Sequence, residues 1–171
     1  IGHNLHMRGK VMNIKNPWIL IVDNYDSFTY NLVQMIKEHG GCNFDVMKKN
    51  VVNIPEAVKY DGFLFSPGPG IPGESPIMSG LLRVYHKKKS ILGICLGHQA
   101  IAETFGMKLI NLDSVRHGLK TVIRITDPSD YIFEGLPAEF EAGLYHSWAA
   151  SADCNATEPV SDLRVTALSI D

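Results

Sequence analysis

The chain has 171 residues, enough for one domain with a substantial hydrophobic core, and 45% of its residues are hydrophobic while 20% are charged. Its formal net charge of −2 gives no electrostatic reason to expect a nucleic-acid partner. No apolar run in the sequence is long enough to span a membrane, and no signal-type segment is evident, so we expect a cytoplasmic protein without a membrane partner. Cys42, Cys95 and Cys154 lack the spacing of a zinc site or a disulfide framework. We therefore predict no metal and no cofactor.

The two ends of the chain differ from its middle. Residues 1–11 show no hydrophobic periodicity, and we interpret them as a tag or a disordered extension. Residues 12–171 are predicted to form a single domain. Because residues 165–171 end as a strand ends, with no closing helix, we expect this domain to lack its C-terminal end.

From residue 18 to about residue 103 the sequence alternates short apolar runs with amphipathic segments. In the first helix Phe28, Leu32, Met35 and Ile36 are expected to face the core, after a cap at Asp26 or Ser27. This alternation predicts an α/β fold, in which a mostly parallel central sheet carries helices on both faces as a three-layer sandwich. Strands are predicted at residues 18–22, 42–47, 62–65 and 91–94, and helices at about 28–39, 54–59, 75–87 and after the fourth strand.

Beyond Met107 the pattern changes to one typical of added antiparallel strands. Residues 121–126 alternate polar and apolar side chains, which predicts a strand exposed on one face. Residues 140–148 and 163–170 are two further candidate strand segments.

Residues 90–99 contain the strongest chemical signal in the sequence. An apolar strand runs into Gly93-Ile94-Cys95-Leu96-Gly97 and then into good helix formers, which is the pattern of a nucleophile elbow with sulfur in place of oxygen. At the N-terminus of a helix the thiolate of Cys95 would be favoured. The alternative is that Cys95 is a small buried core residue, as most free cysteines are. The paired glycines favour the nucleophile.

The loop at residues 66–73 alternates proline and glycine and contains the spacing Gly68-x-Gly70-x-x-Gly73. This is the glycine spacing of a dinucleotide site, but the loop follows the third strand and carries Pro69 and Pro72, so we exclude that interpretation. The loop is either a stiff surface turn or a source of the backbone N–H donors that an oxyanion hole requires.

Other polar residues are candidates for the same site. Gln99 lies one helical turn after Cys95, where it is either a substrate contact or a solvent-facing residue. His98 also lies within reach of the sulfur. Residues 145–148 (Tyr-His-Ser-Trp) either line a cleft or belong to the core. None of the seven histidines is followed two residues later by an acidic residue, so the sequence contains no clear histidine base with an orienting carboxylate.

Four stretches together resemble the class I (triad) glutamine amidotransferases. They are residues 22–32 (Val-Asp-Asn-Tyr-Asp-Ser-Phe-Thr-Tyr-Asn-Leu), 66–70 (Ser-Pro-Gly-Pro-Gly), 93–99 (Gly-Ile-Cys-Leu-Gly-His-Gln) and 145–148. Within the family, the glutaminase subunits of anthranilate synthase are the most similar branch, and those of aminodeoxychorismate synthase, which serve folate synthesis, come second. Trp148 beside Ser147 favours the anthranilate branch slightly.

The resemblance implies a flavodoxin-like fold and assigns roles to individual residues. Cys95 would attack the side-chain amide of L-glutamine, and ammonia would pass to a large synthase subunit that binds chorismate. The N–H groups of Gly70 and Leu96 would be the oxyanion donors. The glutamine-binding positions would be Gly68, Pro69, Gly70, Gln99, Ser147 and Trp148.

The sequence departs from the family in one respect. The family's base is a histidine in a late His-Pro-Glu-Ser segment, oriented by the glutamate two residues on, and no such segment occurs in residues 1–171. We expect it beyond Asp171. Two alternatives remain: a glutaminase-like module that binds glutamine or a partner without turnover, and a cysteine-elbow hydrolase of small esters.

Overall fold

The computed structural model describes residues 15–151 and 162–170, without the side chains of residues 113–117. Its larger sheet is built around β1 (Trp18–Asp23), whose last four residues are all buried. A strand buried on both faces is expected for the interior of a parallel sheet. β1 pairs in parallel with β2 (Asn43–Lys48) on one side and with β3 (Gly62–Phe65) on the other.

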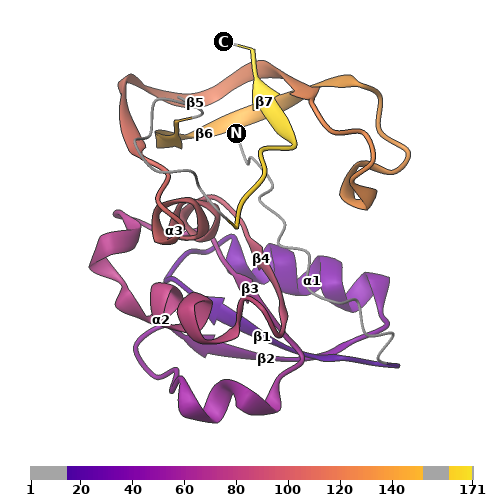
Figure 1. Cartoon of the computed structure of the whole chain (residues 1–171), viewed down its shortest axis with the longest axis vertical. Helices are drawn as coiled ribbons and strands as arrows, with labels where there is room; N and C mark the ends of the chain where they lie inside the picture. Colours follow the sequence, from indigo (N-terminus) through magenta and orange to yellow (C-terminus); the bar gives the residue numbers. More distant parts are fainter. Residues whose placement is uncertain (1–14, 152–161, 171) are drawn as a thin grey trace.

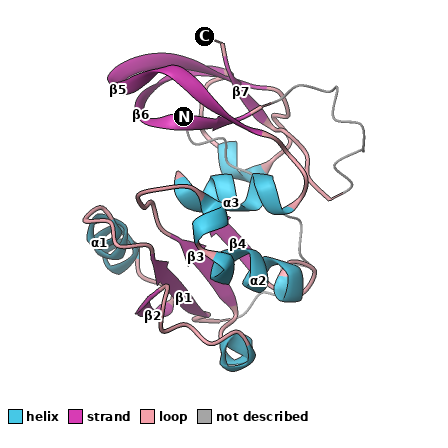
Figure 2. Ribbon diagram, turned by 90° about the vertical axis from the view of Figure 1, so that its left-hand side faces the viewer, coloured by secondary structure: helices cyan, strands magenta, loops and turns pink. Residues whose placement is uncertain are grey.

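Among the described residues the parallel sheet has four strands in the order β2-β1-β3-β4, where β4 spans Ser90–Gly93. Helices cover both of its faces (Figure 2). α1 packs against one face through a cluster around Ile21 and Leu64, while α2 and α3 pack against the other around Leu20 and Phe65. The helices are α1 (Thr29–His39), α2 (Pro76–Tyr85) and α3 (Leu96–Thr104), with short 3-10 turns η1 (Pro55–Lys59), η2 (Pro72–Glu74) and η3 (Tyr131–Phe133).

The buried face of α1 differs from the predicted one. Leu32 and Val33 are buried, but Phe28 is 51% exposed and Met35 is 64% exposed. The prediction for these two side chains is wrong because the helix begins only at Thr29, which leaves Phe28 outside it. Met35 lies roughly 110° around the helix from the centre of the buried stripe. The predicted cap at Asp26 or Ser27 is also wrong, because Phe28 is the N-cap residue and no side chain caps the helix. Asp26 instead stabilises the turn before the helix, where its Oδ1 accepts from the Phe28 N–H at 2.7 Å.

The remaining strands form a separate antiparallel sheet in the order β6-β5-β7. Its strands are β5 (Leu109–Ile125), β6 (Glu139–Ala150) and β7 (Ala167–Ser169). β5 is much longer than the strand predicted at residues 121–126, and irregular pairing interrupts its ladder with β6 in two places. Backbone pairing with β6 extends β5 where the side chains show no clear alternation.

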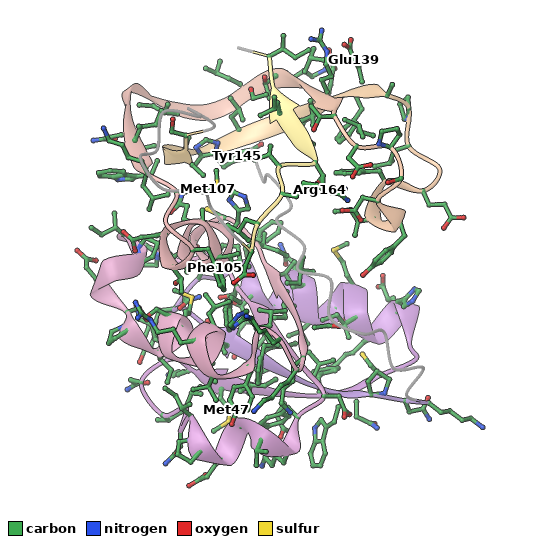
Figure 3. All side chains as sticks on the ribbon, in the orientation of Figure 1. Met47, Phe105, Met107, Glu139, Tyr145 and Arg164 are labelled. Atoms are coloured by element: carbon green, nitrogen blue, oxygen red, sulfur yellow. The ribbon has the colours of Figure 1, made fainter. Side chains whose placement is uncertain are left out.

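α3 lies between the two sheets (Figure 1). Phe105 and Met107, which follow this helix and are labelled in Figure 3, pack against the main hydrophobic cluster on the way to β5. Within the part of the chain that the structure describes, no helix has the length and apolar character needed to cross a membrane. The α/β prediction, with a parallel sheet and added antiparallel strands, is confirmed. Residues 1–11 lie outside the described residues, so the proposed domain boundaries stay predictions.

Candidate active site

Cys95 occupies a sharp turn between β4 and α3. It stands at the N-cap of α3 with φ of 52° and ψ of −106°, a backbone conformation that L residues rarely adopt. The flanking glycines allow the strand and the helix to approach. A Cβ on Gly93 would lie 2.4 Å from the backbone carbonyl of Gly97, and a Cβ on Gly97 would lie 2.5 Å from the carbonyl oxygen of Phe65. The structure therefore has the strand–turn–helix geometry that the glycine spacing predicts.

The thiol of Cys95 is half-buried, and this sets its protonation state. Burial raises its pKa above the ordinary value, and the nearby carboxylate of Asp26 raises it further, while a hydrogen bond from the Leu96 N–H acts in the opposite direction. The helix N-terminus thus favours the thiolate as predicted, but burial has the larger effect. The raised pKa favours the neutral thiol, so using Cys95 as a nucleophile requires a base.

Cys95 opens into a cavity of about 750 Å³. Three of its walls come from the carboxyl edge of the parallel sheet: the loop after β1, the proline–glycine loop after β3, and the turn after β4. This edge is where ligands bind in open α/β sheets. The fourth wall is β6 of the antiparallel sheet, where Tyr145 is labelled in Figure 3. The lining residues are Asp26, Phe28, Pro67, Gly68, Ile94, Cys95, His98, Gln99, Gly143, Tyr145, His146, Trp148, Ala149 and Ala150.

Gln99 connects the helix of the elbow to the far wall of the cavity. Its Nε2 donates to the backbone carbonyl of Trp148 at 2.9 Å, and only 6% of the residue is exposed. This position excludes the interpretation of Gln99 as a solvent-facing helix residue. The hydrogen bond joins α3 to β6, so the side chain contributes to the position of the strand as well as to the cavity surface.

Only some of the residues predicted for the site lie on the cavity wall. Gly68, Cys95, Gln99 and Trp148 line it. Leu96 does not, but its N–H bonds the sulfur of Cys95. The other three predicted positions, Pro69, Gly70 and Ser147, are not among the lining residues.

Gly70 has a left-handed backbone, with φ of 82°. A Cβ at this position would meet the carboxylate of Glu74. The residue is exposed at the outer end of the proline–glycine loop.

The cavity also contains residues that the sequence reasoning did not assign to it. Asp26 and Phe28 come from the loop after β1, and Pro67 begins the proline–glycine loop. The sequence could have indicated these residues, because they follow β1 and β3 and the carboxyl ends of parallel strands meet at one edge of the sheet. Two histidines, His98 and His146, line the cavity as well, and each makes further interactions.

Metal binding has no candidate site in the part of the chain that the structure describes. Among residues 15–151 and 162–170 no group of three or more histidine, cysteine or acidic side chains is placed to hold an ion. Cys42 and Cys95 both carry free thiols, and Cys154 lies outside the described residues.

Known proteins share much of this sequence. Anthranilate synthase component 2 of Lactococcus lactis is 46% identical over 134 residues, which are 75% of this chain and 64% of the relative. Anthranilate synthase component 2 of Thermus thermophilus is 41% identical over 133 residues, covering 77% of this chain and 64% of the relative. The chain thus spans a little under two thirds of the length of both relatives.

Similarity to a solved structure supports the fold. The crystal structure of a glutamine amidotransferase from Thermotoga maritima matches with a TM-score of 0.64 and 14% identity, over 81% of this chain and 64% of that one. The profile of the family described as glutamine amidotransferase class-I matches residues 20–171. Since that match covers most of the sequence and the cysteine elbow lies within it, the chain belongs to the class I glutamine amidotransferase family.

Proposed function

We propose that this chain is the glutaminase part of a glutamine-dependent synthase. The thiol of Cys95 gives its proton to a base, and its sulfur forms a bond to the side-chain amide carbon of L-glutamine, so that the carbonyl oxygen becomes an oxyanion. The carbon–nitrogen bond then breaks, ammonia leaves with a proton from the base, and a thioester remains. Water attacks the thioester, releasing glutamate and returning the proton to the sulfur.

The observation that carries this proposal is the placement of Cys95. A free thiol stands in a strained turn, faces a cavity large enough for an amino acid, and lies against a backbone N–H at the start of a helix. Strained backbone of this kind concentrates at functional sites. Core cysteines have no need of such a turn.

Oxyanion stabilisation is assigned to two backbone groups. The N–H of Leu96, which contacts the sulfur, is one proposed donor, and the N–H of Gly70 in the proline–glycine loop is the other. Two N–H groups aimed at the developing charge are worth several powers of ten in rate when both are preorganised. Glutamine is proposed to bind along Gly68, Pro69, Gly70 and the β6 residues Ser147 and Trp148, with Gln99 holding that strand.

The base is proposed to come from a His-x-Glu segment beyond Asp171. The raised pKa of Cys95 supports this need, because a thiol that is neutral at pH 7 must transfer its proton before it attacks. The names of the relatives from Lactococcus lactis and Thermus thermophilus support a partner as well. We propose that ammonia passes to a synthase subunit that acts on chorismate, in anthranilate synthesis.

Labelling by the chloroketone analogue of L-glutamine tests the proposed glutaminase site in the full-length protein. Peptide mass mapping should find the modification on Cys95 and not on Cys42, and L-glutamine should slow it while L-asparagine should not. Cys42→Ser should keep the labelling and Cys95→Ser should lose it. Equal modification of both cysteines, or no protection by glutamine, would count against a glutamine site.

Turnover tests the synthase role separately. Ammonia release from glutamine should depend on Cys95 and should rise when the synthase subunit is added. A full-length protein that binds glutamine but releases no ammonia with its synthase subunit present would instead be a non-catalytic module.

A further inference from the structure

Asn24 is a fully buried polar residue that directly follows β1. It makes two hydrogen bonds to Ser66, the residue that directly follows the neighbouring strand β3. Its backbone N–H donates to Ser66 Oγ at 2.9 Å, and its side-chain Nδ2 donates to the Ser66 carbonyl oxygen at 2.8 Å. Ser66 Oγ in turn donates to the carbonyl of Pro67 at 2.8 Å. Asn24 therefore holds the first residue of the proline–glycine loop through both its backbone and its side chain.

The middle of the same loop is packed between Asn24 and the elbow. A Cβ on Gly68 would lie 2.5 Å from the Cβ of Asn24, 2.8 Å from the Asn24 carbonyl oxygen, and 2.8 Å from Cδ2 of Leu96. The space that a side chain at Gly68 would need is thus filled by Asn24 together with Leu96, the residue after Cys95. Asn24 itself is not among the residues that line the cavity.

The loop needs such an external restraint because of its composition. Pro67 and Pro69 have no backbone N–H, so neither can donate a hydrogen bond that would fix the loop. Asn24 supplies donors from a neighbouring strand end instead. The side chain also reaches Met78 of α2, with Nδ2 3.5 Å from the sulfur, which ties this contact to the core.

We propose that Asn24 is a positioning residue for the reaction, which fixes the backbone of residues 66–70 relative to Cys95. This inference rests on the proposed function, because it is the oxyanion donor of this loop that would be positioned. An error of about 1 Å in the placement of such a group costs on the order of a hundredfold in rate. A residue that only stabilised the fold would not affect the chemistry of the thiol selectively.

Two alkylating reagents separate positioning from stability in the full-length protein. The chloroketone analogue of glutamine reacts by addition of the thiolate to a ketone, which creates an oxyanion before chloride leaves. Iodoacetamide reacts by direct displacement of iodide and creates none. Both reagents need the thiolate, so the ratio of their rate constants at Cys95 cancels the ionisation of the sulfur. With the chloroketone at saturating concentration its affinity no longer contributes, and the ratio reports on oxyanion stabilisation.

Asn24→Ala and Ser66→Ala should each lower this ratio by about tenfold or more, since a single oxyanion donor is worth on the order of a hundredfold. Tyr85→Phe is the matched control, because it removes a hydrogen bond of similar length, from the Tyr85 hydroxyl to the Ile54 carbonyl at 2.8 Å, away from the loop. The control should lower the free energy of unfolding and leave the ratio unchanged. Ser66→Ala removes the Oγ acceptor and keeps the carbonyl acceptor, so it perturbs the contact with Asn24 less. If Asn24→Ala does not fold, the ratio measured for Ser66→Ala tests the inference.

The outcomes are distinct. Folded Asn24 and Ser66 variants with the wild-type ratio would overturn the inference, as would an equal fall in the ratio for Tyr85→Phe. If the wild-type protein shows no selective reaction of Cys95 with the chloroketone, the proposed function fails instead.

Discussion

At the scale of single residues, Cys95 combines two opposing influences. The N-terminal end of α3 presents the Leu96 N–H to the sulfur, which favours the thiolate, while burial and Asp26 favour the neutral thiol. Burial is the largest of these effects, so the pKa of the thiol is raised in the folded protein. A thiol with a raised pKa reacts more slowly with alkylating and oxidising reagents, because the thiolate is the reactive form.

The pH dependence of alkylation tests this balance. Because the pKa of Cys95 is raised in the folded protein, the midpoint of its iodoacetamide reaction should lie at higher pH than in the urea-unfolded chain. Asp26→Asn should lower the folded midpoint by removing a nearby negative charge, whereas Glu56→Gln, an exposed change on η1, should not. A folded midpoint below the unfolded one would contradict the assignment.

The same shift has a consequence for stability. The folded protein holds the thiol proton more tightly than the unfolded chain does. The contribution of this group to the free energy of unfolding is therefore fully present below the unfolded pKa and decreases as the pH rises through the folded pKa.

At the scale of elements, the junction of β3, β4 and α3 depends on glycine at position 97. The missing side chain leaves room for the carbonyl oxygen and Cβ of Phe65, which a Cβ on Gly97 would approach to 2.5 and 2.6 Å. Both neighbouring atoms belong to a fully buried residue of a central strand. Neither can move without separating α3 from the sheet.

Substitution of Gly97 by alanine should therefore be destabilising. We expect Gly97→Ala to lower the free energy of unfolding in urea by about 1–3 kcal/mol, as overpacking does elsewhere. Gly73→Ala is the control, because a Cβ there meets nothing within 4 Å and its φ is not left-handed. The control should be neutral or slightly stabilising. Comparable losses in the two variants would show that the close approach at Gly97 is not the cause.

The bounds of a strand were predictable where burial requires a continuous run of apolar residues. They were not predictable where the strand is exposed and its sequence has no regular pattern. β3 has the predicted bounds and β1 extends one residue beyond them, because both are continuous apolar runs buried on their two faces. β5 was mostly missed, since its ladder with β6 continues through exposed positions that carry no period-two pattern. On α1 the inward positions of Leu32 and Ile36 were predicted correctly, but Phe28 was not, because the helix begins one residue later than predicted.

At the scale of the whole molecule, the two sheets differ in how much apolar surface they bury. The parallel sheet has helices on both faces and fully buried residues such as Leu20, Val22 and Phe65. The antiparallel sheet is supported by a smaller cluster of Ile123, Phe133 and Ala167. Both sheets nevertheless contribute residues to the cavity. The site therefore lies between the parallel sheet, which buries more apolar side chains, and the antiparallel sheet, which buries fewer.

Hydrogen exchange should follow this division. After correction for intrinsic chemical rates, amides of β1 and β3 should exchange more slowly than amides of β5 around Val122–Arg124, because local opening costs less where fewer apolar side chains are buried. Peptide-resolved mass spectrometry measures both sets in one experiment. Equal protection would mean that the two sheets open as a single cooperative unit.

The sequence by itself determined the strand–turn–helix geometry around Cys95 and the α/β class of the fold. Glycine spacing around Cys95 can satisfy only a tight strand–turn–helix, and apolar strands alternating with amphipathic helices can be buried only in a layered parallel sheet. The tertiary structure decided which residues share the cavity. It brought Asp26 and Phe28 to Cys95, placed Gln99 against Trp148, and set Asn24 behind the proline–glycine loop. These contacts join segments about 40 to 70 residues apart, and local patterns carry no information on which strand ends and loops will meet.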